Sequence, residues 1–166
     1  MPSIDSLTDA FAPADLRQAF SSFATGVTVV TTRNAEGKPV GLTANSFSAV
    51  SLEPPLLLWC ISMTTPSFAA FRDCGHYAIN ILSAEQVEIS NRFANSSPDK
   101  FANLDYEYGP GGSPLIAGCL ASFECRNEIQ YPGGDHLILV GRIEHYHVTS
   151  GAPLLFHGSR YAALQP

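Results

Sequence analysis

The most constraining feature of this sequence is a run of alternating apolar and polar residues between positions 121 and 131. Ala121, Phe123, Cys125, Ile129 and Tyr131 occupy odd positions, whereas the even positions from 122 to 130 are Ser, Glu, Arg, Glu and Gln. A period of two predicts a β-strand with one face exposed to water. A Pro-Gly-Gly turn follows, and a second strand is predicted over 136–148, so the two segments indicate a long antiparallel hairpin.

Further strands are predicted where β-branched or apolar residues run between turn formers. These segments are Val27–Thr32, Pro39–Ala44, Leu56–Ile61, His76–Leu82 and a final short strand that ends near Tyr161. The first two flank a turn at 34–37 and are expected to form a second hairpin. Leu56–Ile61 is too short for a helix and too continuous for an exposed strand, which predicts a buried strand.

Helix signals are few and lie between the strands. Pro13 opens an amphipathic helix in which Leu16, Ala19, Phe20 and Phe23 recur with helical spacing. A short helix is predicted over 66–72, and Ser83 with Gln86 forms a capping-box pattern for a helix that ends near residue 94. Residues 95–114 are expected to form a long ordered excursion with at most a short helix near Phe101.

The balance of elements predicts a mainly β protein, a closed or nearly closed antiparallel barrel with helices on its outside. A length of 166 residues suits a single domain, which we place at 13–166 after a loose arm at 1–12. Apolar residues make up 45% of the chain and charged residues only 14%, and glycine and proline are frequent, as expected for many short strands joined by turns.

Charge and hydropathy exclude several classes of partner. The formal net charge is −6 and the nine cations are scattered, which argues against a nucleic-acid groove or an anionic membrane patch. The longest strongly apolar run, 56–61, is far shorter than the roughly 20 residues of a membrane span. Acidic residues stand where a signal peptide would carry lysine or arginine, so we expect a cytoplasmic protein with no membrane partner.

Cysteine and histidine spacing gives no support for a metal site. Cys60, Cys74, Cys119 and Cys125 lie in apolar segments without Cys-x-x-Cys spacing, so reduced core thiols are expected rather than zinc ligands or a redox pair. His145 and His147 share a strand face, but no third ligand is evident. His76 and His157 are equally unsupported as ligands.

Two polar segments are candidate binding elements. The segment 43–48, with Ser51 after it, concentrates hydroxyls and an amide between two apolar strands, and these groups can bind phosphate or the edge of a planar heterocycle. The hairpin tip at 131–136 has two glycines, which let a flat ligand approach the backbone, with Asp135 and His136 at the rim. Ordinary loop caps and a plain turn are the alternative interpretations. Gly-x-Gly-x-x-Gly, the P-loop and Gly-x-Ser-x-Gly are all missing from the sequence.

Taken together, five motifs resemble the short-chain flavin reductases, which supply reduced flavin to two-component monooxygenases. The motifs lie at 23–32, 41–47, 50–55, 133–136 and 153–157, and the resemblance runs from about residue 14 to 164. It implies an antiparallel Greek-key split β-barrel, the FMN-binding split barrel, with a few peripheral helices. It also implies a homodimer with flavin near the subunit interface, reduction of FMN or FAD by NADH or NADPH, and diffusion of the reduced flavin to a separate monooxygenase.

The resemblance also assigns roles to individual residues. It implies flavin contacts from Thr43, Ala44, Asn45 and Ser46, with Ser51 close to the ring, a strand edge at Cys60, Ile61 and Ser62, and a phosphate end at Ser67, Arg92 and Phe93. Gly134, Asp135 and His136 would meet the nicotinamide, with His136 as the catalytic residue that positions it.

One departure from the family pattern concerns phosphate binding. Many relatives carry a basic residue where this sequence has Met63. Phosphate neutralisation would then depend on Arg92, Ser67 and the N-terminus of the helix expected to begin at Pro66.

Two other functions remain open on the residues alone. One is a flavin-binding electron carrier without steady NADH oxidation, which would have no need of the Gly-Asp-His tip. The other is a barrel for an apolar ligand, since barrels host many functions. No basic pocket for a 2′-phosphate is evident, which favours NADH over NADPH.

Overall fold

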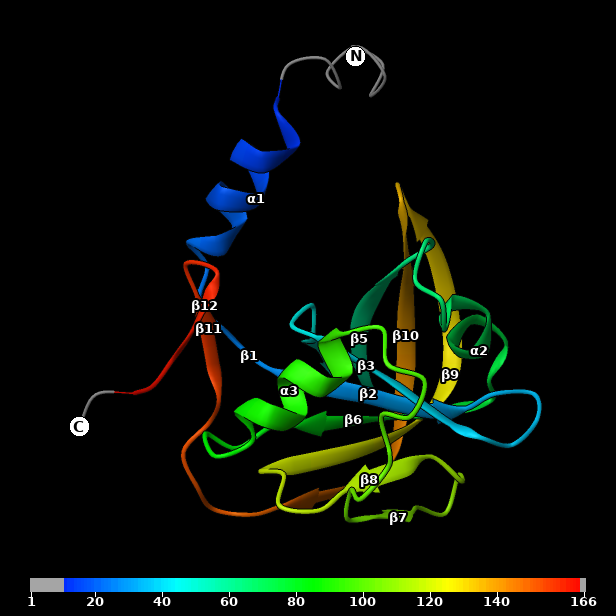
Figure 1. The fold of residues 1–166 in the computed structure, drawn as a ribbon. Coiled ribbons are helices and arrows are strands. Elements are labelled where there is room, and N and C mark those ends of the chain that lie inside the picture. The colour runs from blue at the N-terminus through cyan, green and yellow to red at the C-terminus, as the bar shows by residue number, and fades with distance from the viewer. Residues whose placement is uncertain (1–10, 165–166) are drawn as a thin grey trace.

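A computed structural model describes residues 11–164, so most of the arm predicted at 1–12 lies outside the described residues (Figure 1). A seven-stranded antiparallel sheet dominates the fold, in the order β3-β2-β6-β9-β10-β5-β4. Its strands are β2 (Thr28–Arg33), β3 (Pro39–Ala44), β4 (Ser48–Leu52), β5 (Pro55–Ser62), β6 (His76–Ile81), β9 (Ala121–Gly133) and β10 (His136–Val148). The prediction of a mainly β antiparallel fold is confirmed.

Two small sheets and three helices complete the chain. β1 (Thr25–Gly26), β11 (Leu155–His157) and β12 (Arg160–Ala162) form one sheet, and β7 (Tyr106–Tyr108) pairs with β8 (Pro114–Ile116). The helices are α1 (Pro13–Ser21), α2 (Phe68–Asp73) and α3 (Val87–Ala94). The final segment, predicted as one short strand, is therefore two strands, β11 and β12. None of the helices in 11–164 is long and apolar enough to cross a bilayer.

The two predicted hairpins are both present. β2 pairs with β3 across the turn at 34–37, and β9 pairs with β10 from Ala121 opposite Val148 to Gly133 opposite His136. The alternation predicted for β9 does not persist along the whole strand, because a bulge interrupts the pairing between Asn127 and Ile129. A bulge inserts one residue and reverses the side-chain phase. Ile129, predicted on the buried face, is consequently 42% exposed.

Glu124 is a second correction, since its even position predicts exposure and its side chain is only 2% exposed. The excursion at 95–114 covers this face of β9, and the backbone N–H of Gly111 donates to Glu124 Oε2 at 2.8 Å. A Cβ at Gly109 would lie 2.5 Å from the same oxygen, so a side chain at this position would displace the Glu124 carboxylate. The excursion also contains β7, which pairs with β8 where the excursion ends, and a turn in place of the helix expected near Phe101; neither strand was predicted.

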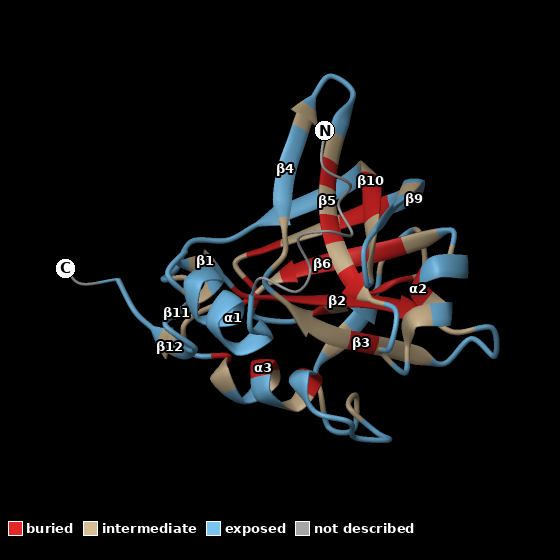
Figure 2. Ribbon diagram, turned by 90° about the horizontal axis from the view of Figure 1, so that it is seen from above, coloured by how far each residue is buried: buried red, intermediate tan, exposed pale blue. Residues whose placement is uncertain are grey.

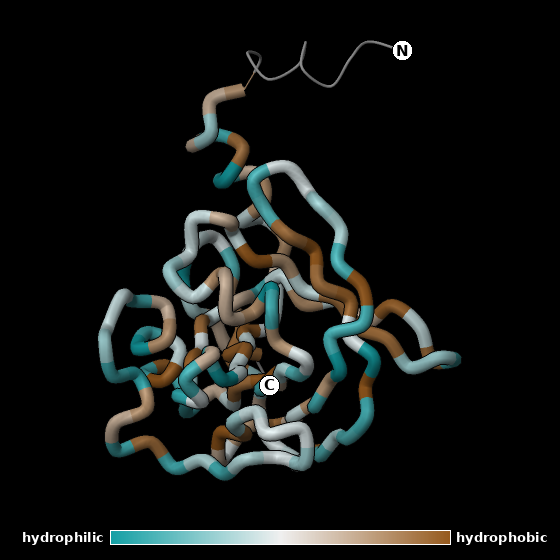
Figure 3. The backbone as a smooth tube through the Cα atoms, turned by 90° about the vertical axis from the view of Figure 1, so that its right-hand side faces the viewer, coloured by the Kyte–Doolittle hydropathy of each residue, from teal (hydrophilic) through white to brown (hydrophobic). Residues whose placement is uncertain are grey.

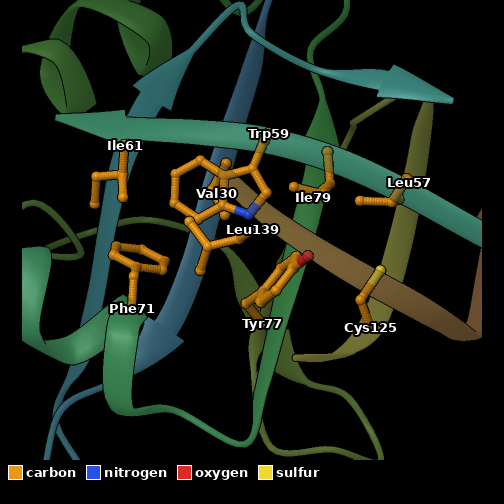
Figure 4. Packing of buried hydrophobic residues seen from close by; sticks show 9 residues of the cluster. All are labelled: Val30, Leu57, Trp59, Ile61, Phe71, Tyr77, Ile79, Cys125 and Leu139. Carbon is orange, nitrogen blue, oxygen red and sulfur yellow. The ribbon is translucent and has the colours of Figure 1, made fainter. Parts of the chain in front are cut away.

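The main core lies between the curved strands and α2. It contains Val30, Leu57, Trp59, Ile61, Phe71, Tyr77, Ile79, Cys125 and Leu139 (Figure 4). The Trp59 ring meets Phe71 edge-on at 5.1 Å between centroids and Tyr77 at 5.8 Å. Burial of each large apolar side chain contributes about 1.5–3 kcal/mol to stability. A second cluster of buried residues, which includes Val29, Leu82 and Phe93, packs beneath α3.

The buried amide of Asn80 joins the strands to β8. Asn80 Nδ2 donates to Val29 O and to Thr31 Oγ1, both at 3.1 Å, and Asn80 Oδ1 accepts from the N–H of Ile116 at 2.9 Å. Buried polar groups are costly without such partners. This network therefore fixes the position of β8 across the barrel wall.

The predicted helices are present with shorter bounds. α2 begins at Phe68, so the helix N-terminus expected at Pro66 is displaced, and six residues make only a short helix. Ser83 N–H donates to Gln86 Oε1 at 3.0 Å, which is half of the predicted capping box, but α3 begins at Val87. α1 has no buried residue and stands beside β11 and β12, away from the barrel (Figure 1).

Candidate functional site

The polar segment after β3 packs directly against β5. Ser46 Oγ accepts from Cys60 N–H at 3.0 Å and lies 3.1 Å from Cys60 O, to which its hydroxyl donates. These two bonds replace strand pairing at this point and attach the loop to the outer edge of β5. The sequence fragment predicted to contact flavin is thus held beside the strand edge predicted to line the same site.

The glycine-rich tip of the β9–β10 hairpin meets the other end of the same edge. His136 is paired opposite Ser62, and Met63 N–H donates to Asp135 O at 3.0 Å. Ser62 and Cys60 are two residues apart on one strand, which is about 6.6 Å. Cys60 and Ser62 therefore connect the Ser46 loop to the tip, and the structure brings the two candidate binding elements together.

Side-chain alternation on β5 divides the predicted edge residues. Leu57, Trp59 and Ile61 point into the core, whereas Cys60 and Ser62 are half-buried on the opposite face. Ile61 can therefore offer a ligand only its backbone. His136, as the cross-strand partner of Ser62, shares the outward face with Cys60 and Ser62.

Asp135 and His136 form a polar pair at the tip. His136 Nδ1 lies 2.7 Å from Asp135 Oδ1, and this contact holds the pKa of the Asp135 carboxyl below its usual value. With Nδ1 engaged, Nε2 is the ring nitrogen left for a ligand. Gly134 has a φ of 69°, and a Cβ at this position would meet no atom within 4 Å, so the space above the tip is open to a flat group.

A groove of about 1140 Å³ runs along β3, α2 and the segment after α3, and its lining does not include Cys60, Ser62 or the hairpin tip. Three residues predicted for the flavin site line it: Thr43, Ser67 and Phe93. Thr43 Oγ1 donates to Ser90 O at 2.6 Å, so the oxygen remains free to accept a hydrogen bond from a ligand hydroxyl. The groove exceeds the roughly 300–1,000 Å³ typical of small-molecule pockets, which suits a nucleotide-sized ligand.

Four predicted residues lie elsewhere or contribute differently. Arg92 does not line the groove, and its Nη1 donates to Ala102 O at 3.1 Å. Ser51 lies on β4 and is paired opposite Leu56 of β5. Leu56 is about 13 Å along β5 from Cys60. Ala44 packs against the core and Asn45 is exposed at the strand end.

Sequence reasoning missed Lys100, which lines the groove close to Phe93. Lys100 Nζ donates to Phe93 O at 2.9 Å and to Gly41 O at 3.3 Å. The chain has only two lysines, and one of them is seven residues after the predicted phosphate-end residue Phe93. Because lysine is rare in this chain, its occurrence near Phe93 could have marked Lys100 as a candidate. The turn that brings Lys100 back to α3 has no clear sequence pattern, so its position could not be predicted.

The four cysteines are free thiols, with Cys119 and Cys125 buried and Cys60 and Cys74 half-buried. Burial raises the pKa of each thiol, to about 12 for Cys119 and Cys125. Cys60 is therefore a neutral, weakly polar group at the candidate site, unsuited to act as a nucleophile.

The residues present fit a bound flavin. The Cys60–Ser62 edge would hold a flat ring, Thr43 Oγ1 could accept from a ligand hydroxyl, and Ser67, whose side chain has no hydrogen bond within 11–164, could bind a phosphate. Hydroxyls and backbone groups of this kind bind heterocycles and phosphate without a large positive charge.

Comparison with known proteins also relates this chain to flavin reductases. The family model described as "Flavin reductase like domain" matches residues 20–165. The chain is 40% identical to the flavin-dependent monooxygenase reductase subunit HsaB of Rhodococcus jostii, over 95% of this chain and 81% of the relative. It is 43% identical to the FMN reductase (NADH) SmoA of Agrobacterium fabrum, over 87% of this chain and 82% of the relative.

Solved structures show the same architecture. The NADH:FAD oxidoreductase SgcE6 of Streptomyces globisporus, in complex with NAD and FAD fragments, superimposes with a TM-score of 0.88 and 37% identity, over 92% of this chain and 93% of that one. The split-barrel prediction is confirmed by such neighbours. Some curated relatives are longer, and the chain spans 43% to 59% of the length of three of them.

Proposed function

This chain belongs to the flavin reductase-like domain family, and we propose on that premise that it is an NADH-dependent flavin reductase. It transfers hydride from NADH to FMN or FAD, and the reduced flavin diffuses to a separate monooxygenase. The observation that carries the proposal is the meeting of the Ser46 loop and the Gly134–His136 tip at one strand edge, Cys60–Ser62.

A flavin and a nicotinamide supply the hydride-transfer chemistry when both are bound. The chain's own residues then have to hold and align the two rings, and positioning of this kind lowers barriers by up to about 7–11 kcal/mol. Ser46 and the β5 edge would hold one ring, and His136 would present Nε2 to the amide of the other. Asp135 keeps the His136 ring oriented through Nδ1. No residue is required as a nucleophile.

The proposal includes a homodimer with the flavin near the subunit interface. Ile138 on β10 is half-buried and lies opposite Tyr131 on β9, and Tyr131 and Ile129 are 52% and 42% exposed, so apolar side chains reach the surface beside the tip that carries His136. Leu52 on neighbouring β4 is 95% exposed, and β4 is exposed along most of its length (Figure 2). Exposed apolar side chains at these positions favour association with a partner.

A second apolar surface supports the same proposal. On α1, Leu16 and Phe20 face outward, and Phe23 just after the helix is 78% exposed. Brown apolar segments are visible on α1 where it projects from the barrel (Figure 3). The amphipathic pattern of the helix is satisfied if a second subunit covers this stripe.

We place this reductase in the cytoplasm, because four free thiols are typical of a reducing compartment. NADH is the proposed donor. At the tip, the carboxylate of Asp135 is the charged neighbour of His136, and no arginine or lysine lies in the segment 129–139 to attract an additional phosphate.

The test is oxidation of NADH and NADPH, followed by absorbance, with FMN, FAD and riboflavin as acceptors, combined with gel filtration to measure flavin retention. Flavin-dependent oxidation of NADH, faster than that of NADPH, is expected. Flavin retention without NADH oxidation would support the electron-carrier alternative instead. Absence of both flavin binding and NADH oxidation would contradict the proposal.

A further inference from the structure

Lys100 occupies an unusual position for a lysine. It is half-buried in the groove wall, its Nζ donates to Phe93 O and Gly41 O, and it lies 6.0 Å from the centroid of the Phe93 ring. An ammonium group has three N–H donors, and two are used by these carbonyls. One donor remains, held in place by the other two bonds and located at the groove.

The other charged side chains along the groove already have partners. Its two carboxylates, Glu36 and Asp73, each form an ion pair with a cation within two residues in sequence. The guanidinium of Arg33 lies 5.3 Å from the centre of the Tyr108 ring. Within residues 11–164, Lys100 has no carboxylate within 4 Å, and burial lowers its pKa. A buried ammonium without a counter-ion is stabilised when an anion binds.

The groove that contains this ammonium also contains free hydroxyl groups. Thr65 and Ser67 line the same groove, and neither side chain has a hydrogen-bond partner within the described part of the chain. By contrast, Arg92 directs its guanidinium to Ala102 O. The groove therefore offers one fixed cation and two free hydroxyls, which is a donor set suited to phosphate oxygens.

We propose that Lys100 is the residue that binds the flavin phosphate and makes this enzyme prefer phosphorylated flavins over riboflavin. The inference rests on the proposed function, because it assumes that the groove receives the phosphate end of the flavin substrate. It assigns to Lys100 the role that the family resemblance implied for Arg92. Lys100 acts in binding and not in hydride transfer, since no residue of the Gly134–His136 tip lines its groove.

The experiment compares FMN and riboflavin as substrates of the wild-type chain, Lys100→Gln and Lys100→Arg. Lys38→Gln is the matched control, because Lys38 is the other lysine, is exposed and pairs with Glu36. Kd is measured by flavin fluorescence and KM by NADH oxidation. For Lys100→Gln we expect FMN affinity to fall about tenfold or more, the loss of one charged hydrogen bond, with riboflavin affinity unchanged. Lys100→Arg should restore part of the preference, and Lys38→Gln should equal the wild type.

Several outcomes would overturn the inference. Equal losses for FMN and riboflavin in Lys100→Gln would assign Lys100 a structural role at Phe93 and Gly41. If Lys100→Gln kept the wild-type preference for FMN over riboflavin, phosphate binding would be assigned to Arg92 or another group. A loss of FMN affinity seen in Arg92→Gln but not in Lys100→Gln would have the same meaning. Turnover of riboflavin by the wild-type chain tests the proposed function separately. A chain that reduces riboflavin is a flavin reductase even if substitution of Lys100 has no effect on FMN binding.

Discussion

At the scale of single residues, alternation on β5 decides which side chains a ligand can meet. Trp59 and Ile61 complete the core, so Cys60 and Ser62 face outward at the strand end. His136 joins them because it is paired with Ser62 across the strands. The local pattern thus alternates core side chains with side chains of the candidate site along one strand.

His136→Ala tests the role of the hairpin tip. We expect KM for NADH to rise about tenfold or turnover to fall by a similar factor, with flavin Kd nearly unchanged, because the ring positions the nicotinamide and not the flavin. Steady-state kinetics and fluorescence titration measure the two effects. His145→Ala, on the same strand but far from the tip, is the control. Unaltered NADH kinetics in His136→Ala would remove this residue from the site.

The buried thiols predict a dependence of stability on pH. Burial raises the pKa of Cys119 and Cys125 to about 12, whereas thiols of the unfolded chain ionise near pH 9. Between these values the unfolded state binds fewer protons, so stability falls as pH rises, by at most about 1.4 kcal/mol per pH unit for each thiol. Thermal unfolding at about pH 8, 9 and 10 should show a decreasing Tm, with a shallower decrease in Cys125→Ala. Equal slopes in both proteins would assign the effect to other groups.

At the scale of elements, the β9–β10 hairpin illustrates what could be predicted. Both strands and their turn follow from alternation and from Pro-Gly-Gly. The bulge between Asn127 and Ile129 could not be read in advance, because Glu128 suits a regular strand as well as a bulge. Its consequence is large, since it moves Ile129 and Tyr131 to the outward face.

Gly141, opposite Asn127 at this bulge, is predicted to be intolerant of a side chain. A Cβ there would overlap Tyr77 Oη and lie 2.8 Å from Cys125 Cβ in the core. Gly141→Ala should therefore reduce the free energy of unfolding by about 1–3 kcal/mol, as measured by urea denaturation. Gly26→Ala, where a Cβ meets nothing within 4 Å, is the matched control. If Gly141→Ala were as stable as the control, the core would be able to accommodate the added methyl group with little loss in the free energy of unfolding.

At the scale of the whole molecule, the sequence predicts the barrel but not how its ends are covered. The strands β2, β3, β5, β6, β9 and β10 all match predicted segments. For the excursion at 95–114 the sequence indicates only that it is ordered, because its β7–β8 pair depends on long-range bonds from Asn80 and Glu124. The position of Lys100 depends on the same excursion, and for this reason the predicted site includes Arg92 but not Lys100.

The exposed apolar surfaces predict that the molecule is a dimer. Leu52→Glu should shift the protein toward the monomer in size-exclusion chromatography with light scattering, because a buried carboxylate at an interface is costly. Since Leu52 is almost fully exposed within one chain, the change should leave the monomer fold intact by circular dichroism. Lys38→Glu makes a similar change of charge on an exposed turn and should remain a dimer. A wild-type protein that is monomeric at all concentrations would contradict the proposed assembly.

The central claim is that one flavin ring lies between the Ser46 loop, the Cys60–Ser62 edge and the hairpin tip. A crystal structure of the chain with flavin and NAD bound measures this most directly. We expect the flavin ring against Cys60–Ser62 and the nicotinamide within hydrogen-bond distance of His136 Nε2. A flavin bound elsewhere in the assembled molecule, with the tip and the Ser46 loop both free of ligand, would contradict this claim.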